Sequence, residues 1–169
     1  SLQCGEKTLD LSTPAVMGIL NLSPDSFYDG GRYSDQSNML RRVETMIQEG
    51  AGIIDIGGVS SRPGSKEVDS KIEMSRVIPV IQQVVKEFPD HIFSVDTYRS
   101  DIAYMAVQAG ASMINDISGG DMDNDMFATV SNLKTAYLLM HMKGVPEKMQ
   151  EGPEYTDVVY EVGAVLENK

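Results

Sequence analysis

The sequence contains a single cysteine, few basic residues and no long apolar run. Cys4 alone excludes an intramolecular disulfide and fits a reducing compartment, so we expect a cytoplasmic protein. No stretch approaches the ~18 apolar residues of a membrane span. The chain also does not open with a basic segment and an apolar core, so we expect no signal peptide and no membrane partner.

The scarcity of positive charge limits the possible partners. The chain has 14 Lys and Arg residues against 25 Asp and Glu residues, and its formal net charge is −11. A phosphate backbone needs a basic face, so we expect no nucleic-acid binding. An anionic small-molecule substrate would need local cations or a metal. The 169 residues, 41% of them hydrophobic, are enough for one domain with a real core, which we place at residues 1–169.

Short apolar runs alternate with amphipathic stretches along the chain. This strict alternation predicts an α/β fold with a parallel sheet and right-handed crossovers, after a lead-in at 1–14 that can form a hairpin. The expected strands are 15–20, 52–57, 92–96, 112–117 and 135–141, and the expected helices are 38–49, 70–88, 100–110, 123–132 and one from about 155.

Two of the predicted helices carry specific start signals. Asp69 can cap the helix over 70–88, with Ile72 among its inward apolar residues. Pro79 within it predicts a kink or a later true start. Ser100 is expected to cap the helix that ends at Gly110.

Polar side chains lie at or just past the carboxyl ends of the successive predicted strands. A barrel gathers all such ends into one mouth, whereas an open doubly wound sheet gathers only those near a switch point. The pattern favours (β/α) units of a TIM barrel, about five of eight, although a five-stranded open sheet remains an alternative. The polar positions are Asn21, Asp55, residues 60–62, Asp96, Asn115 and His141.

The residue types at these ends favour a polar heterocycle. Asp96 could accept two parallel hydrogen bonds from a guanidine-like edge, or it could cap the next helix. Asn115 offers a donor and an acceptor to a heterocycle edge, or it could make a strand-end turn. Asp55, inside an apolar run, is more easily explained as an internal hydrogen-bonding group than as a ligand.

Two polar loops could bind anionic groups or a metal. Ser60, Ser61 and Arg62, before Pro63, combine two hydroxyls and a guanidinium, which suit a phosphate or carboxylate. In the earlier loop Asn21, with the nearby Ser23 and Asp25, could hold Mg²⁺ through hard oxygens. His141 has no second histidine or cysteine nearby, which argues against zinc, and no nucleophile elbow supports a serine triad.

Five ordered stretches of the chain resemble the signatures of the dihydropteroate synthase family of pterin-binding TIM barrels. The two long ones run from Val16 to Gly31 and from Ile54 to Gly64; the others are Ser94–Thr97, Ile114–Ile117 and Leu139–Gly144. Together they cover about residues 15–160. The resemblance implies a transferase of folate biosynthesis. Enzymes of this family join 4-aminobenzoate to 6-hydroxymethyl-7,8-dihydropterin diphosphate, and sulfonamides compete for the aminobenzoate position.

The resemblance also implies roles for individual residues. Asn21 would contact Mg²⁺ that carries the diphosphate, and Asp96 and Asn115 would hold the pterin edge. Asp96, Asn115 and Arg62 would be the catalytic residues. The other expected contacts are Ile117 and Met140 in the pterin pocket, Ser61, Arg62 and Pro63 near diphosphate and aminobenzoate, and Phe27 and Asp29 in a closing first loop.

The chain departs from the family pattern in its second loop and in its extent. Ser61 stands where many members have Thr, and Val59 where Glu is common. The family's later Asp, Lys and Arg–His groups have no counterpart within 169 residues, so we expect an incomplete barrel that is inactive alone. Two other hypotheses are a methyltetrahydrofolate–corrinoid methyltransferase type of barrel and a non-catalytic half barrel. The two open sheet edges also predict self-association, most simply as a homodimer.

Overall fold

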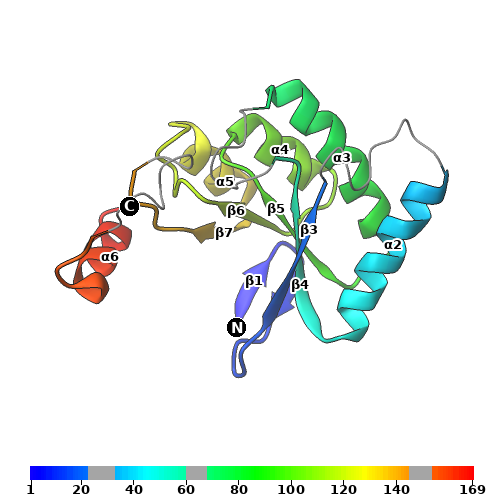
Figure 1. Cartoon of the computed structure of the whole chain (residues 1–169), viewed down its shortest axis with the longest axis horizontal. Coiled ribbons are helices and arrows are strands. Elements are labelled where there is room, and N and C mark those ends of the chain that lie inside the picture. The colour runs from blue at the N-terminus through cyan, green and yellow to red at the C-terminus, as the bar shows by residue number, and fades with distance from the viewer. Residues whose placement is uncertain (23–32, 60–67, 145–153) are drawn as a thin grey trace.

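The computed structural model describes residues 1–22, 33–59, 68–144 and 154–169 (Figure 1). The strands within these ranges are β1 (Leu2–Cys4), β2 (Lys7–Leu9), β3 (Val16–Asn21), β4 (Ala51–Gly57), β5 (Ile92–Asp96), β6 (Met113–Asp116) and β7 (Ala136–Leu139). The helices are α2 (Tyr33–Gln48), α3 (Ser70–Glu87), α4 (Ser100–Gln108), α5 (Met126–Leu133) and α6 (Val158–Glu167).

Strands β3 to β7 form one parallel sheet in which each strand lies beside the next in the sequence. Helices α2, α3, α4 and α5 all pack on the same face of this sheet (Figure 1). A doubly wound sheet would reverse its strand order and carry helices on both faces. The open-sheet alternative is therefore wrong, and the arrangement is that of five consecutive (β/α) units of a barrel.

The helix-facing core explains the apolar character of the strands. Ile54 and Ile56 of β4, Phe93 and Val95 of β5 and Ile114 of β6 are fully buried against the helices. The opposite face of β4 is also largely covered, which is why its sequence is apolar at nearly every position, as expected of a central parallel strand.

A hairpin covers the other face of the sheet near the strand starts. β1 and β2 pair antiparallel, as expected for the lead-in, but they form a two-stranded sheet of their own. Cys4 and Leu9 from this hairpin pack with Ile53, Ile92 and Met113. This second core covers the inner face at the strand starts, and the hairpin leaves the strand ends uncovered.

Two helices differ from the sequence prediction. α2 begins at Tyr33, whereas the sequence predicts a start at residue 38. The predicted start is late because the polar residues before Met39 lack the apolar spacing by which a helix is recognised. α3 begins at Ser70 with Asp69 as its N-cap, as predicted, and continues through Pro79, so a later start is wrong. Ile72 is 48% exposed rather than inward, and its neighbour Glu73 is buried instead, at 1%.

The start of α4 is not capped as expected. Its N-cap is Arg99, without a side-chain cap, and Ser100 is the first helical residue. The backbone N–H of Ser100 is bonded instead by Asp123 Oδ2 at 2.7 Å, a partner from the segment after β6 that local sequence could not reveal. α6 lies apart from the other helices and buries none of its residues (Figure 1). None of the helices in the described ranges is both long and apolar enough to cross a membrane.

Candidate functional site at the strand ends

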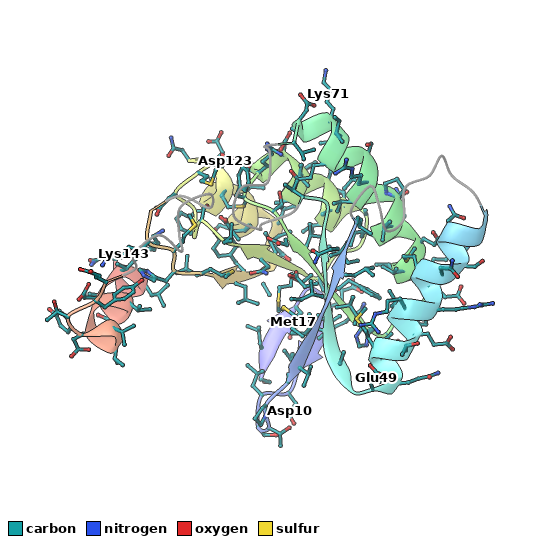
Figure 2. All side chains as sticks on the ribbon, viewed as in Figure 1. Asp10, Met17, Glu49, Lys71, Asp123 and Lys143 are labelled. Atoms are coloured by element: carbon teal, nitrogen blue, oxygen red, sulfur yellow. The ribbon has the colours of Figure 1, made fainter. Side chains whose placement is uncertain are left out.

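One row of register-matched residues crosses the sheet where the strands end. Asn21 of β3 pairs with Gly57 of β4, Gly57 with Asp96 of β5, and Asp96 with Asn115 of β6. Residues in register on parallel neighbours project to the same face. The predicted gathering of Asn21, Asp96 and Asn115 on the inner face is therefore present. In Figure 2, Lys71 and Asp123 lie on the side of the molecule where β3 ends, and Asp10 and Glu49 lie on the opposite side.

Gly57 leaves space for the two side chains beside it. A Cβ at this position would lie 3.3 Å from Asn21 Oδ1 and 3.6 Å from Asp96 Oδ2. These two oxygens therefore flank the bare glycine backbone, one from each neighbouring strand. The sequence did not single out Gly57, because a glycine at a strand end normally signals only a turn.

Asn115 is held by a carboxylate two strands away. Its Nδ2 donates to Asp55 Oδ2 at 2.9 Å, across the β5 position occupied by the small Ser94. Asp55 is 4% exposed, and burial raises the pKa of its carboxyl, an effect opposed by hydrogen bonds. Asp55 is thus an internal hydrogen-bonding group, as the sequence suggested.

Three buried side-chain oxygens at this place have no hydrogen-bond partner within the described part of the chain. They are Asp55 Oδ1, Ser94 Oγ and Asn115 Oδ1. Buried polar atoms normally have hydrogen-bond partners, so each unpaired atom needs an explanation. The Ser94 hydroxyl lies in register with Asp55 and is a donor that acts to lower the pKa of its carboxyl, so it can satisfy Asp55 Oδ1. Asn115 Oδ1 is then the acceptor left for a ligand that offers an N–H donor.

The Asp96 carboxyl has an unusual protonation equilibrium. Burial raises its pKa to about 7, and the neighbouring negative charges of Asp55, Glu73 and Asp116 act in the same direction. Asp96 does not cap α4, whose N-cap is Arg99, so the helix-cap alternative for Asp96 is wrong. Its side chain is therefore free of a structural role at the helix and is half-buried at the mouth.

The residues after Asp96 and within α3 support the strand end from the helix face. The Thr97 hydroxyl donates to Glu73 Oε1 at 2.8 Å, and Glu73 Oε2 accepts from Arg99. Sequence reasoning missed both Thr97 and Glu73. Thr97 could have been found from the sequence, because it directly follows the predicted site residue Asp96. In the sequence, nothing distinguishes Glu73 from a solvent-exposed carboxylate on a helix.

Asp116 fixes the turn after β6. It is fully buried and accepts from the N–H groups of Ser118 and Gly120, at 2.8 and 2.9 Å, and from the Tyr137 hydroxyl at 2.7 Å. Burial, helped by Asp116, raises the pKa of the Tyr137 phenol. Ile117 lies in this turn and is half-buried.

The predicted residues on β7 lie just past its end. Met140 and His141 are both half-buried there. His141 Nε2 lies 3.0 Å from the hydroxyl of Tyr155, and Lys143 sits 4.2 Å above the Tyr155 ring. Met140 thus has the location expected of a pocket residue, and its contact with a ligand stays a prediction.

Several predicted site residues lie outside the described ranges. In the first loop these are Ser23, Asp25, Phe27 and Asp29, and in the second loop they are Ser60, Ser61, Arg62 and Pro63. Their expected roles stay predictions.

The oxygens at the mouth suit a hard cation. The part of the chain that is described contains no group of three His, Cys, Asp or Glu side chains placed to hold a metal. Mg²⁺, however, needs only one or two protein oxygens because it keeps waters and binds substrate phosphates. Asn21 Oδ1, which lies beside Gly57, is an oxygen of this kind. The donor set therefore fits magnesium bound mainly through water and phosphate.

The chain is similar to known proteins of one family. Residues 17–169 match the family model described as pterin binding enzyme. The dihydropteroate synthase of Synechocystis is 45% identical over 147 residues, which are 87% of this chain and 50% of that protein.

Solved structures show the same likeness. Dihydropteroate synthase of Yersinia pestis, in complex with a sulfonamide drug, has a TM-score of 0.86 and 38% identity over 99% of this chain and 60% of its own. That of Xanthomonas albilineans has TM-scores of 0.82 with 4-aminobenzoic acid and 0.78 with 7,8-dihydropteroate, at 38% and 35% identity. These matches cover 98% of this chain and 57% and 56% of the Xanthomonas chains. The chain thus spans about half to three fifths of these relatives, and it belongs to the pterin binding enzyme family.

Proposed function

We propose that this chain forms the pterin-binding side of a dihydropteroate synthase. The observation that carries the proposal is the row Asn21, Gly57, Asp96 and Asn115 across four adjacent strand ends, with Asp55 behind it. The row brings acceptor oxygens onto one face. The names and ligands of the similar proteins support a pterin as the group that meets them.

The polarity of these hydrogen bonds suits the edge of a pterin. Because the side-chain N–H of Asn115 donates to Asp55, Oδ1 of Asn115 remains as an acceptor. Asp96 in its ionised form accepts two parallel hydrogen bonds from adjacent N–H groups. A pterin ring offers such donors from its ring nitrogens and its 2-amino group. Ile117 and Met140, beside the row, would supply apolar contact to the ring.

The proposed reaction is a displacement at the methylene carbon of 6-hydroxymethyl-7,8-dihydropterin diphosphate. The bond from that carbon to the diphosphate oxygen breaks, and its electron pair leaves with diphosphate. The amine of 4-aminobenzoate forms the new carbon–nitrogen bond and then loses a proton to solvent. Carboxylates at Asp96 and Asp55 favour the positive charge that spreads over the pterin ring as the leaving group departs.

Magnesium is part of this proposal. Asn21 Oδ1, with water and the phosphate oxygens, would hold it at the mouth. When bound, it would neutralise the negative charge of the leaving diphosphate. The proposal further places Ser61, Arg62 and Pro63 near diphosphate and aminobenzoate, and Phe27 and Asp29 over the closed site.

Titration of the chain with 6-hydroxymethylpterin tests the proposal directly. We expect saturable binding that Asp96→Asn weakens at least about tenfold, because an amide cannot accept two parallel N–H donors. Asp125→Asn makes the same chemical change at an exposed position near α5 and should leave binding unchanged. Equal affinity of the Asp96 variant and the parent chain would refute the assignment.

The alternatives from the sequence receive less support. The similar proteins described above are dihydropteroate synthases, one of them with a sulfonamide, and none of the described residues specifically favours a corrinoid methyltransferase. A homodimer and a cytoplasmic location remain part of the proposal. Sedimentation and cell fractionation of the protein in its source organism test them.

A further inference from the structure

A buried carboxylate lies behind the strand ends and touches no part of the proposed ligand face. Glu73 projects from α3 into the helix-facing side of the sheet and is 1% exposed. A charged group is rarely buried to this degree unless it is paired. Its partners therefore indicate what it does.

Glu73 holds the residue that follows Asp96. Its Oε1 accepts the Thr97 hydroxyl hydrogen at 2.8 Å, and the same hydroxyl oxygen accepts the Arg99 backbone N–H at 3.2 Å. The backbone N–H of Thr97 in turn donates to the Asn115 carbonyl at 3.0 Å. Thr97 thus fixes the end of β5 to α3 through its side chain and to the end of β6 through its backbone.

Two guanidinium groups extend this arrangement to both flanks of residues 60–67. Arg99, which is paired with Glu73, donates from its second terminal nitrogen to the Val68 carbonyl at 2.8 Å. Arg76, one turn along α3, donates to the Gly58 carbonyl at 3.0 Å. Gly58 and Val68 lie on either side of the segment that carries Ser61 and Arg62.

The packing at Gly58 shows how closely α3 approaches the end of β4. A Cβ there would lie 2.6 Å from Val77 Cγ2 and 3.1 Å from Glu73 Cγ. Only glycine permits this approach without displacing the helix. The Glu73 turn of α3 therefore lies against the end of β4, the end of β5 and the chain that follows residue 67.

We propose that Glu73 is a positioning residue that sets pterin affinity without touching the ligand. Through Thr97 and Arg99 it fixes the Asp96 strand end relative to both flanks of residues 60–67. The ligand named here rests on the function proposed above. The negative charge of Glu73 also acts on the site, because it is among the charges that raise the pKa of Asp96, with Asp55 on β4 and Asp116 on β6.

A near-isosteric substitution separates positioning from simple stabilisation. Glu73→Gln keeps an oxygen for the Thr97 hydroxyl but removes the charge that pairs with Arg99. Glu87→Gln is the matched control, since it makes the same change at an exposed position of the same helix. Each variant of the full chain would be measured by NMR titration of the Asp96 carboxyl, by binding of 6-hydroxymethylpterin and by thermal unfolding.

We expect Glu73→Gln to weaken pterin binding about fivefold, the size of one lost hydrogen bond, when binding is measured above about pH 8, where Asp96 is ionised in both chains. The variant should also lower the pKa of Asp96, because a neighbouring negative charge is removed. Both effects should be present at temperatures where the variant is fully folded. Glu87→Gln should change neither quantity. A folded Glu73→Gln chain with the parent affinity and the parent Asp96 titration would overturn the inference, whatever its melting temperature.

Two further measurements keep the test decisive. If Glu73→Gln does not fold, Thr97→Val removes the same link while conserving volume, and parent-like binding by that variant overturns the inference. If the parent chain binds no pterin, the proposed function fails, and the titration of Asp96 in Glu73→Gln still decides whether Glu73 acts on this strand end.

Discussion

Asn115 Nδ2 and Asp55 Oδ2 form a 2.9 Å hydrogen bond that joins β6 to β4 over the intervening strand. The bond fixes which end of the Asn115 amide faces the mouth. The oxygen is left for a ligand, and the nitrogen is consumed inside the protein. The site consequently offers mainly acceptors, which selects ligands rich in N–H donors.

Asp55 therefore determines the orientation of the Asn115 amide at the ligand face, although Asp55 itself makes an internal hydrogen bond. Asp55→Ala removes the acceptor and lets the Asn115 amide turn over, so we expect pterin binding to weaken about tenfold. Asp55→Asn retains an acceptor oxygen and should bind more tightly than Asp55→Ala. Calorimetric titration of the two variants measures the difference, and identical affinities would show that the Asn115 orientation does not depend on this bond.

Gly57 is expected to matter for binding more than for folding. Gly57→Ala places a methyl group 3.3 Å from Asn21 Oδ1 and 3.6 Å from Asp96 Oδ2, so these side chains must shift by tenths of an ångström. We expect at least about a fivefold loss of pterin affinity with about 1 kcal/mol or less of lost stability.

Gly52→Ala is the control on the same strand, since its nearest neighbour would lie at an ordinary 3.7 Å. If both variants bind like the parent chain, the space at Gly57 has no role in the site.

The raised pKa of Asp96 predicts how stability depends on pH. Its folded-state value of about 7 lies above the ordinary 3.8, so the folded protein holds the proton more tightly than the unfolded chain. The stability from this proton is complete below about pH 4 and is lost as the pH rises to 7. Asp96→Asn should therefore gain stability over the parent between pH 5 and pH 8, by roughly 1 to 3 kcal/mol.

Urea unfolding at several pH values measures this gain. Asp55 and Glu73, whose pKa values are also raised by burial, contribute to the pH dependence that remains. A pH-independent difference between Asp96→Asn and the parent chain would mean that Asp96 titrates normally.

Ligand binding should depend on the same proton in the opposite sense. If ionised Asp96 accepts the donors of a neutral pterin, affinity falls by about tenfold for each pH unit below its folded-state pKa. Titrations between pH 5.5 and 7.5 test this expectation, with Asp96→Asn as a pH-insensitive reference. Affinity that rises as the pH falls would assign the protonated carboxyl to the complex.

The edge strands make self-association a testable expectation. β3 and β7 are the outer strands of the five-stranded sheet. Ile19 and Leu138 on them are 64% and 36% exposed and lie on the inner face, in register with Asp55 and Asn115. Open, apolar edges favour pairing with another chain. We expect light scattering to report a dimer or larger species that Ile19→Lys shifts towards monomer. A compact monomer at micromolar concentration would contradict the expectation.

Local pattern was enough to predict the parallel sheet and the strand ends at which Asn21, Asp96 and Asn115 lie together. The strand at Ile92–Asp96 and the Asp69 cap follow from apolar runs and from capping chemistry that act within a few residues. Asn21, Asp96 and Asn115 could be placed together because successive parallel strands end on the same side.

Only the tertiary structure decided the partners of these residues and the face that each helix buries. A short apolar pattern does not reveal that Ile72 is exposed and Glu73 buried, since the partners of Glu73, Thr97 and Arg99, lie 24 and 26 residues away. The same holds for Asp55 and Asn115, separated by 60 residues, and for the Asp123 bond to Ser100. The sequence alone determines which residues lie at the strand ends, because strand positions depend on local backbone geometry. The hydrogen-bond partners of these residues depend on which distant segments the folded sheet and helices bring into contact.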